Sequence, residues 1–312
     1  MMASSPQASN NSITRRFKQV DVFTKTPLLG NPLAVILDSD GLTDAQMQGI
    51  ARWTNLSETT FVLPPTEPSA DYRVRIFTTD RELPFAGHPT LGTAHALLEN
   101  GLATKQPNKI VQQCGAGLVE IAIAGETVDS RTLSFRSPAC HPAALEDPAQ
   151  IKLLTDALVG VEVDNTVAPM SALIGLNWLV VRLRSVEDVL AFRPIPALIK
   201  EVVERLNVGG IAIYSAFDAN QLMAFGVNYE LRTFFIEQDN LIEDPVTGSA
   251  NACLARVLQE QGFPDHGTTA KQYMARQGTL RNREGRILVT YFDGEPWIGG
   301  QSVTLINGTI KI

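Results

Sequence analysis

Short runs of β-branched and aromatic residues, separated by polar or Gly/Pro-rich turns, recur along most of the chain. Runs of about four to eight such residues are typical of strands, and short connections favour antiparallel pairing between them. The pattern therefore predicts a protein in which sheet dominates. The predicted strands are Phe17–Phe23, Leu33–Leu37, Thr59–Leu63, Tyr72–Phe77, Leu118–Ile123, Trp178–Leu183, Ile211–Tyr214 and Arg286–Tyr291.

Helical periodicity appears in three segments of two kinds. Over Asp44–Thr54 the apolar residues recur on one face, and Thr43 with Gln46 offers a capping box, so a surface helix with one buried face is predicted. In contrast, Thr90–Glu99 and Thr247–Gln259 carry Leu, Ala, Cys or Val on most sides. That pattern is typical of a helix enclosed by other elements. We expect two sheets, each wrapped around one enclosed helix.

The two enclosed helices follow similar motifs. The first motif reads His88-Pro-Thr-Leu-Gly-Thr-Ala, and the second, 156 positions later, reads Asp244-Pro-Val-Thr-Gly-Ser-Ala. Arg75-Ile-Phe and Arg232-Thr-Phe precede them at similar distances. A repeated strand, loop and helix indicates a duplicated unit, so we expect both helix starts to face one cleft. The Pro/Ala-rich stretch Ser137–Pro148 predicts the boundary between the halves.

Length and composition suit two domains with a core each. The chain has 312 residues, of which 44% are hydrophobic and 19% charged. Residues 1–15 are predicted to be a disordered tail because Met1 to Thr14 is polar and rich in Ser and Asn; a transit peptide ending in Arg15-Arg16 is the alternative. We expect an N-terminal domain over 16–136, completed by a strand near 303–312, and a C-terminal domain over 137–302.

Charge and cysteine content exclude several classes of partner. The chain has 26 basic and 33 acidic residues, a net charge of −7, and no basic block interleaved with aromatics, so we expect no nucleic-acid partner. No apolar run reaches the roughly 18 residues of a membrane span, so no membrane partner is expected. Three cysteines without a C-x-x-C pair fit a reducing compartment, which predicts a cytoplasmic protein.

Three ionisable residues are candidates for chemistry. Glu58 lies between a predicted helix and a strand, where apolar neighbours would raise its pKa, as general acid/base catalysis requires; a solvated or cap-paired side chain is the alternative. His88 and Asp244 begin the two motifs. Because Asp is a favoured N-cap and His is not, capping competes with a functional role for Asp244 more than for His88.

The two predicted helix starts also offer a place for an anion. Free N–H groups near Gly92-Thr93 and Gly248-Ser249 would attract negative charge. We therefore expect a small carboxylate-bearing substrate between the halves. The hydroxyls of Thr93 and Ser249 would either bind that substrate or hydrogen-bond within their own helices.

Motifs for metals, cofactors and covalent catalysis are missing. The sequence has no H-E-x-x-H and no cysteine cluster, and His88 lies seven positions from His95, so we expect no metal site. It also has no G-x-G-x-x-G after a strand and no P-loop, so no cofactor is expected. Cys253 falls inside the second helical pattern and is interpreted as a core residue rather than a nucleophile.

Four ordered blocks give the chain a family resemblance over nearly everything after the tail. It resembles the phenazine-biosynthesis PhzF-like isomerases, which are related in fold to diaminopimelate epimerase. The resemblance implies an α+β fold of two pseudo-symmetric domains, each a mixed, largely antiparallel sheet rolled around a central α-helix, and often a homodimer. The blocks are Val20-Asp-Val-Phe with Gly30-Asn-Pro-Leu-Ala-Val, Asn55-Leu-Ser-Glu-Thr-Thr-Phe-Val, Arg75-Ile-Phe-Thr with Glu82-Leu-Pro-Phe-Ala-Gly-His-Pro, and Asp244-Pro-Val-Thr-Gly-Ser-Ala.

The resemblance also implies proton transfer without cofactor or metal, in a site between the domains. In the phenazine enzyme a glutamate takes a proton from one carbon of a dihydro-hydroxyanthranilate ring and returns it to another. Glu58 matches that glutamate, and the epimerase relatives use a cysteine pair that is missing here, so one-base isomerisation is expected. A non-catalytic binding protein that keeps the cleft is the alternative. Residues expected to surround the substrate are His88, Asp244, Ser249, Gly248, Gly87 and Asn31.

Overall fold

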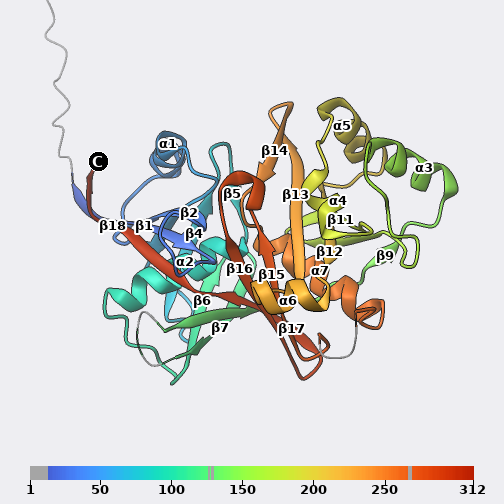
Figure 1. Cartoon of the computed structure of the whole chain (residues 1–312). Helices are drawn as coiled ribbons and strands as arrows, with labels where there is room; N and C mark the ends of the chain where they lie inside the picture. Colours follow the sequence, from blue (N-terminus) through green and yellow to red (C-terminus); the bar gives the residue numbers. More distant parts are fainter. Residues whose placement is uncertain (1–12, 126, 128–129, 266–268) are drawn as a thin grey trace, which may run out of the picture.

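The computed structural model describes residues 13–125, 127, 130–265 and 269–312, which form two lobes joined by sheet (Figure 1). Most of the tail predicted over residues 1–15 lies outside this range. Its last two residues do not belong to a tail, because β1 (Thr14–Val22) already begins at Thr14 and pairs there with Lys311. Within the described part of the chain, no helix is long and apolar enough to cross a membrane.

The first lobe is a mixed sheet rolled around one helix. Across the sheet the strands run in the order β18, β1, β2, β3, β4, β6, β7 and β8, with β5 paired to β4, and only β2–β3 and β4–β6 are parallel. The elements are β2 (Asn31–Ile36), α1 (Asp44–Thr54), β3 (Thr59–Leu63), β4 (Tyr72–Phe77), β5 (Glu82–Leu83), α2 (Gly87–Glu99), β6 (Lys109–Cys114), β7 (Gly117–Ala124), β8 (Thr132–Arg136) and β18 (Ser302–Lys311).

The second lobe repeats this plan. Its strands run in the order β9, β10, β11, β12, β13, β15, β16 and β17, with β14 paired to β13 and with β11–β12 and β13–β15 parallel. The elements are β9 (Ala143–Ala144), α3 (Pro148–Ala157), β10 (Met170–Ile174), β11 (Leu176–Arg182), α4 (Val186–Ala191), α5 (Pro196–Arg205), β12 (Gly210–Ala216), α6 (Ala219–Phe225), β13 (Tyr229–Glu237), β14 (Asn240–Asp244), α7 (Gly248–Glu260), β15 (Gln272–Gln277), the 3-10 helix Thr279–Arg281, β16 (Gly285–Phe292) and β17 (Glu295–Gly300).

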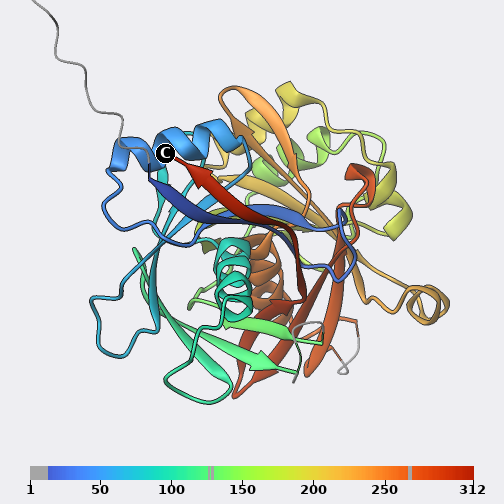
Figure 2. The ribbon, with the colours of Figure 1, turned by 90° about the vertical axis from the view of Figure 1, so that its left-hand side faces the viewer.

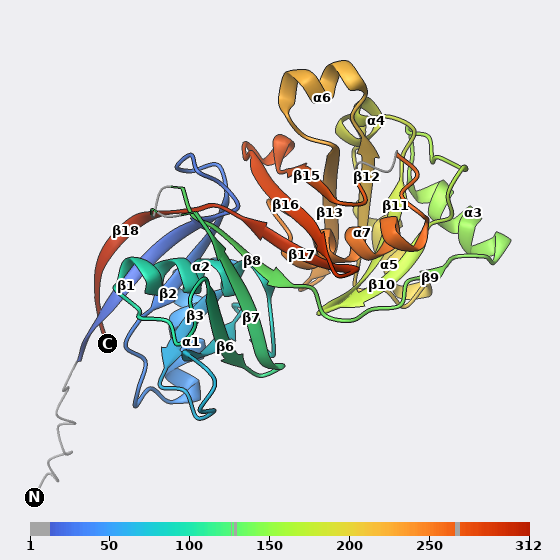
Figure 3. The ribbon, with the colours of Figure 1, turned by 90° about the horizontal axis from the view of Figure 1, so that it is seen from below.

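Two connections tie the lobes together. The edge strand β8 of the first lobe pairs with β17 of the second, from Leu133–Gly300 to Arg136–Trp297, so both sheets are continuous. The chain then returns as β18, which pairs with β1 along its whole length (Figure 3). The strand expected near 303–312 thus lies in the first lobe, while the domain boundaries expected from the sequence stay a prediction.

Each lobe encloses one helix, and the two helices lie side by side in the interior (Figure 2). Every residue of α2 from Gly87 to Leu97 is buried, and α7 is buried from Ala250 to Leu258. The all-round apolar pattern therefore identified these helices correctly. However, α2 begins at Gly87, three residues before the expected start at Thr90. The helix tolerates Pro89 in its first turn because the N–H that proline lacks would have no partner inside the helix there.

The outer helices cover the sheets from the solvent side. α1 packs Met47, Ile50 and Ala51 onto strands β3 and β4 and carries the expected Thr43–Gln46 capping box. In the second lobe, α3, α4 and α5 bury apolar side chains such as Ile199 against β11, β12 and β13. The enclosed helices are thus left to position the site, while the outer ones complete the core.

The lobes repeat one unit, but not in the register that the sequence motif suggested. The Arg75 guanidinium lies over the Phe77 ring and pairs with Glu82. In the second lobe the Arg232 guanidinium lies over Phe234 and pairs with Glu243.

This correspondence continues into the helices, each 13 residues long, which begin at Gly87 and Gly248, 161 positions apart. The structural counterpart of His88 is therefore Ser249, and Asp244 corresponds to Leu83. The prediction that His88 and Asp244 are counterparts was wrong because the β13–β14 hairpin is four residues longer than β4–β5.

Candidate functional site

The starts of α2 and α7 meet at the junction of the lobes. A Cβ atom built on Gly248 would lie 3.3 Å from the Cα of Gly87 and 3.3 Å from the backbone nitrogen of His88, a contact so tight that glycine favours this close approach. No side chain of the described residues caps either helix start. Two positive helix ends with free first-turn N–H groups thus point at one region, an arrangement suited to an anion.

The anion site expected near Gly92-Thr93 lies elsewhere. Gly92 is inside α2, where a Cβ would lie 2.6 Å from Leu33 Cδ2, so this glycine serves close packing. Thr93 is fully buried, and its hydroxyl donates to Thr60 Oγ1 at 2.9 Å. Among the residues expected to bind substrate, the structure therefore separates Thr93 from the others.

Glu58 and His88 lie next to each other at the same junction. Glu58 stands in the turn from α1 to β3, and its Oε2 is 3.5 Å from Nε2 of His88 in the first turn of α2. The side chains are 16% and 6% exposed. Neither of the two facing atoms has a hydrogen-bond partner among the described residues. This pair is therefore buried, mutually close and still able to bond a ligand.

Burial sets the ionisation of this pair. Loss of water raises the pKa of Glu58 to about 8, and the charges of Asp244 and Glu237 add to the effect. Burial lowers the pKa of His88 to about 3. At neutral pH the histidine is thus neutral and Glu58 is mostly protonated, which places the carboxyl in the range where it can both take and give a proton.

Asp244 enters the same region from the second lobe, at the end of β14. Asn31 Nδ2 donates to Asp244 Oδ1 at 3.3 Å and to the carbonyl of Val246 at 2.8 Å, while the Thr247 hydroxyl donates to the other carboxylate oxygen. Burial raises the pKa of Asp244 to about 6 against these hydrogen bonds. The capping alternative for Asp244 is wrong, because Thr247 occupies the N-cap position of α7.

The β1–β2 loop holds Asn31 in place. Asp21 accepts the N–H of Gly30 at 3.1 Å, and a Cβ on Gly30 would lie 2.3 Å from the carbonyl oxygen of Val22. The same loop is tied to the second lobe by the Glu284 N–H, which donates to the carbonyl of Leu29. Asn31 is fully buried and its Oδ1 has no partner within the described residues. The amide therefore links both lobes and keeps an acceptor for a ligand.

Two further residues belong to the site and were missed from the sequence. The indole N–H of Trp178 in β11 donates to Ser249 Oγ at 3.0 Å, across 71 positions. Glu237, near the end of β13, adds charge close to Glu58. Trp178 was expected only as a strand residue, and no local pattern connects it with Ser249. Only the packing of the lobe brings them together.

The tips of two hairpins meet across the lobes. Gln238 Nε2, beyond β13, donates to Asp80 Oδ1, beyond β4, at 2.7 Å. Both side chains are exposed, so this bond is weaker than the buried contacts below it. It joins the β4–β5 and β13–β14 hairpins, which lead into the two helix starts.

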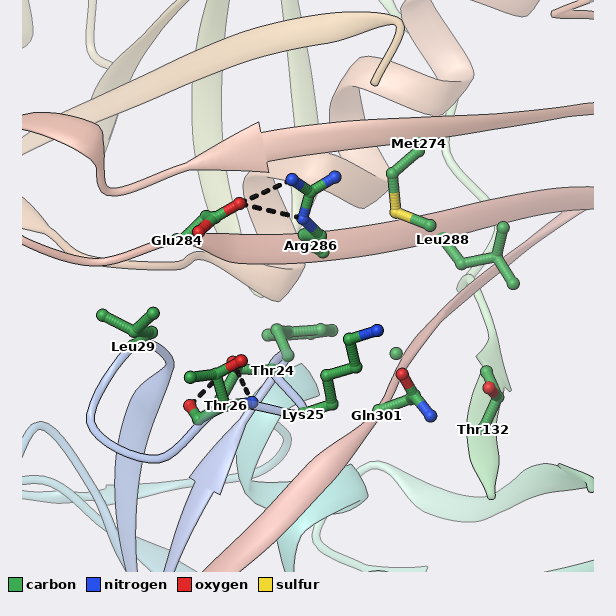
Figure 4. Close-up of a pocket in the computed structure, with 12 residues that line it drawn as sticks. Thr24, Lys25, Thr26, Leu29, Thr132, Met274, Glu284, Arg286, Leu288 and Gln301 are labelled. Carbon is green, nitrogen blue, oxygen red and sulfur yellow. Dashed lines mark hydrogen bonds and ion pairs between the residues drawn. The ribbon is translucent and has the colours of Figure 1, made fainter. Parts of the chain in front are cut away.

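A cavity of about 400 Å³ lies outside the candidate site (Figure 4). It opens between the β1–β2 loop and the strands of the second lobe, and none of Glu58, His88, Asp244 and Ser249 lines it. The candidate site is thus defined by converging side chains and helix starts rather than by this cavity. Its lining is Phe23, Thr24, Lys25, Thr26, Leu29, Thr132, Met274, Glu284, Arg286, Leu288, Gly300 and Gln301. The described residues hold no group of three or more His, Cys, Asp or Glu suited to a metal ion.

Comparison with known proteins gives a consistent result. The sequence model of the phenazine biosynthesis-like proteins (PhzC-PhzF) matches residues 20–308. An uncharacterized isomerase of Mesorhizobium japonicum is 34% identical over 314 residues, covering 96% of this chain and 99% of the relative. The trans-2,3-dihydro-3-hydroxyanthranilate isomerase of Pseudomonas aeruginosa is 56% identical over 82 residues, 26% of this chain and 29% of the relative.

The fold agrees with the sequence match. The crystal structure of a PhzF-family phenazine biosynthesis protein of Bacillus anthracis superposes with a TM-score of 0.78 at 25% identity, covering 96% of this chain and 100% of that one. The fold class expected from the resemblance is therefore confirmed, with one enclosed helix in each of two similar lobes.

Proposed function

Because the chain belongs to the phenazine biosynthesis-like family and is an isomerase, we propose that it moves a proton between two carbons of a small carboxylate-bearing substrate, with Glu58 as the acid/base. The observation that carries this proposal is the buried Glu58 carboxyl, 3.5 Å from His88 Nε2 beside the uncapped starts of α2 and α7.

The proposed reaction balances within the substrate. The Glu58 carboxylate takes a proton from one carbon, and the C–H electron pair moves into the neighbouring bond. The carboxylic acid so formed returns the proton to a second carbon as the electron pairs shift along the substrate. Product and substrate are isomers, so no oxidant or co-reactant enters. A pKa of about 8 makes both forms of Glu58 accessible near neutral pH.

His88 acts beside Glu58 without changing its own charge. Its pKa of about 3 keeps the imidazole neutral at physiological pH. A neutral imidazole has one donor and one acceptor nitrogen, so the ring can bond either form of Glu58 or a polar group of the substrate. We assign His88 to orienting the carboxyl and the substrate rather than to carrying the proton.

The helix starts supply the proposed carboxylate site. First-turn N–H groups of α2 and α7 converge where Gly87 and Gly248 touch, and the Ser249 hydroxyl lies in the same turn. Each such terminus favours an anion by about 0.3–1 kcal/mol when exposed, and by more when buried. On the other side, Asp244 and the free Oδ1 of Asn31 offer acceptors for a donor group of the substrate.

Isotope exchange tests the proposal and separates it from a non-catalytic binding protein. The protein is incubated in deuterated buffer with trans-2,3-dihydro-3-hydroxyanthranilate and with small cyclic and amino-acid-like carboxylates, and proton NMR follows each carbon-bound proton. Isomer formation or deuterium incorporation with any of these compounds supports the proposal. Saturable line broadening without exchange in every case would instead establish a binding protein.

A further inference from the structure

The structural counterpart of Glu58 in the second lobe is a glycine. Thr59 in β3 pairs with Phe77, and Ile211 in β12 pairs with the corresponding Phe234. The residues just before them, Glu58 and Gly210, therefore hold equivalent places. The second lobe thus carries no side chain where the first carries its acid/base.

Trp178 fills the space over that glycine. It pairs with Gly210 across β11 and β12, and a Cβ built on Gly210 would lie 2.5 Å from Trp178 Cζ3. The indole is 2% exposed and meets the Phe235 ring edge-on, with the centroids 6.5 Å apart. A Cβ at position 210 would also lie 2.7 Å from the carbonyl oxygen of Phe234, so the ring and the neighbouring backbone together exclude a second carboxyl from this place.

The contact between Trp178 and Ser249 determines which way the Ser249 hydroxyl proton can point. An indole N–H can only donate, so Ser249 Oγ must accept in this hydrogen bond. A serine hydroxyl has a single proton, and within the described part of the chain no carbonyl or carboxylate oxygen accepts it. Ser249 is partly exposed in the first turn of α7, beside Gly248. Its O–H is therefore kept for an acceptor at the helix start.

We propose that Trp178 is a positioning residue, which holds Ser249 as a hydrogen-bond donor to the carboxylate of the substrate. Ser249 then orients the substrate from the second lobe, as its counterpart His88 does from the first. The inference rests on the proposed function for the identity of the ligand. At the place that corresponds to Glu58, the second lobe offers no carboxyl, because Gly210 lies under Trp178.

The hydrogen bond itself is tested without any ligand. In nitrogen-15-labelled protein, Trp178→Phe identifies the indole N–H resonance of Trp178 among those of the three tryptophans. Ser249→Ala is expected to shift this resonance upfield and to speed its exchange with solvent, while those of Trp53 and Trp297 stay in place. An unchanged Trp178 resonance in Ser249→Ala would overturn the proposal.

The positioning role is tested by a double-mutant cycle on binding. Each variant is made in a Glu58→Gln background, which prevents turnover, and titrated with trans-2,3-dihydro-3-hydroxyanthranilate. Loss of a hydrogen bond to a charged group typically weakens binding about tenfold. We expect Ser249→Ala to do so, Trp178→Phe to weaken binding by a similar factor, and the double variant to be no weaker than Ser249→Ala.

The control is Trp53→Phe, because Trp53 is 78% exposed to solvent on α1. Losses that multiply in the double variant would show that Trp178 acts independently of Ser249 and would overturn the proposal. Failure of every variant, Glu58→Gln alone included, to bind this compound would overturn the donor role toward this carboxylate, whereas the proposed function is tested separately by the exchange experiment with the other carboxylates. The indole resonance would still establish the contact, so the two failures are distinguishable.

Discussion

The carboxyl oxygen Oε2 of Glu58 lies 3.5 Å from Nε2 of His88, in a junction where both side chains are largely shielded from water. Burial acts oppositely on the two groups, raising the pKa of the acid to about 8 and lowering that of the imidazole to about 3. Both groups are therefore mainly neutral at pH 7. Such displaced pKa values cluster at functional sites.

The pH dependence of turnover follows from this pair. If the Glu58 carboxylate removes the proton, kcat/KM rises with pH and levels off above the pKa of about 8. His88 adds no change near the ordinary histidine value, because its pKa lies near 3, so a second change near pH 6 belongs to Asp244, whose pKa is about 6. Initial rates between pH 5 and 10 measure this profile. A rate that falls as pH rises through 8 would assign Glu58 to the acid form in the first step.

Asp244→Asn is expected to move that profile to lower pH. The charge of Asp244 is the second cause of the raised pKa of Glu58, after burial. Removing that charge favours the Glu58 carboxylate, so its pKa falls and the rising limb shifts below 8. The variant is also slower because Asp244 lies in the site. However, the pH at which kcat/KM reaches half its maximum does not depend on the size of that maximum. A limb that stays or moves upward contradicts the charge coupling.

The buried Glu58 also makes stability depend on pH. Its folded pKa of about 8 lies above the ordinary value of 4.5, so the folded state holds the proton more tightly and stability falls as pH rises from about 5 through 8. Glu58→Gln removes this loss, which is on the order of a few kcal/mol. Thermal unfolding at pH 5 and pH 9 should show the variant relatively more stable at pH 9. Equal differences at both pH values would refute this.

Glu99, in the same lobe, makes stability depend on pH in the opposite direction. Hydrogen bonds from Lys18 and Thr304, together with His95 Nε2 at 3.3 Å, outweigh burial and lower its pKa to about 2. Its stabilising effect is complete above the ordinary value of 4.5 and is lost as pH falls through 2. Glu99→Gln should therefore destabilise the protein by about 1–3 kcal/mol at pH 7 and by less at pH 2.5. Denaturant unfolding at the two pH values checks the sign.

Gly248→Ala tests the close approach of the helix starts. The new methyl group would press on the backbone of Gly87 and His88, which cannot turn aside as a flexible side chain can. We expect at least tenfold weaker binding of a carboxylate probe and a lower melting temperature, of a size typical of overpacking, about 1–3 kcal/mol. Gly308→Ala in β18 is the matched control, because nothing lies within 4 Å of its added Cβ. Equal binding by both variants would contradict the helix-start site.

Local signals in the sequence predicted much of the fold. The span Asp44–Thr54 and the strands Thr59–Leu63 and Tyr72–Phe77 agree residue for residue, because capping and side-chain alternation are properties of neighbouring positions. The enclosed helices were identified by their apolar residues on all sides. The first turn of α2 was missed, since its start at Gly87 has no side-chain cap to mark it in the sequence, whereas the predicted span Thr247–Gln259 includes the first turn of α7.

The site depended on contacts that no local pattern encodes. Asn31 meets Asp244 across 213 positions and Trp178 meets Ser249 across 71, both through packing of the lobes. The family resemblance supplied Asn31, while nothing in the sequence pointed to Trp178. The Pro that follows both His88 and Asp244 suggested a wrong alignment of the two repeats. In the correct alignment Ser249 corresponds to His88, which the greater length of the second hairpin made hard to recognise from the sequence.

The most direct measurement compares Glu58→Gln with the unaltered protein in the deuterium-exchange experiment, using whichever carboxylate the unaltered protein converts. The amide keeps the shape of the carboxyl but cannot accept the proton. We expect binding within a few-fold of the original and exchange of the carbon-bound proton reduced at least 10²-fold, the lower end of general acid/base contributions. Exchange at the original rate in Glu58→Gln would contradict the assignment of Glu58 as the acid/base.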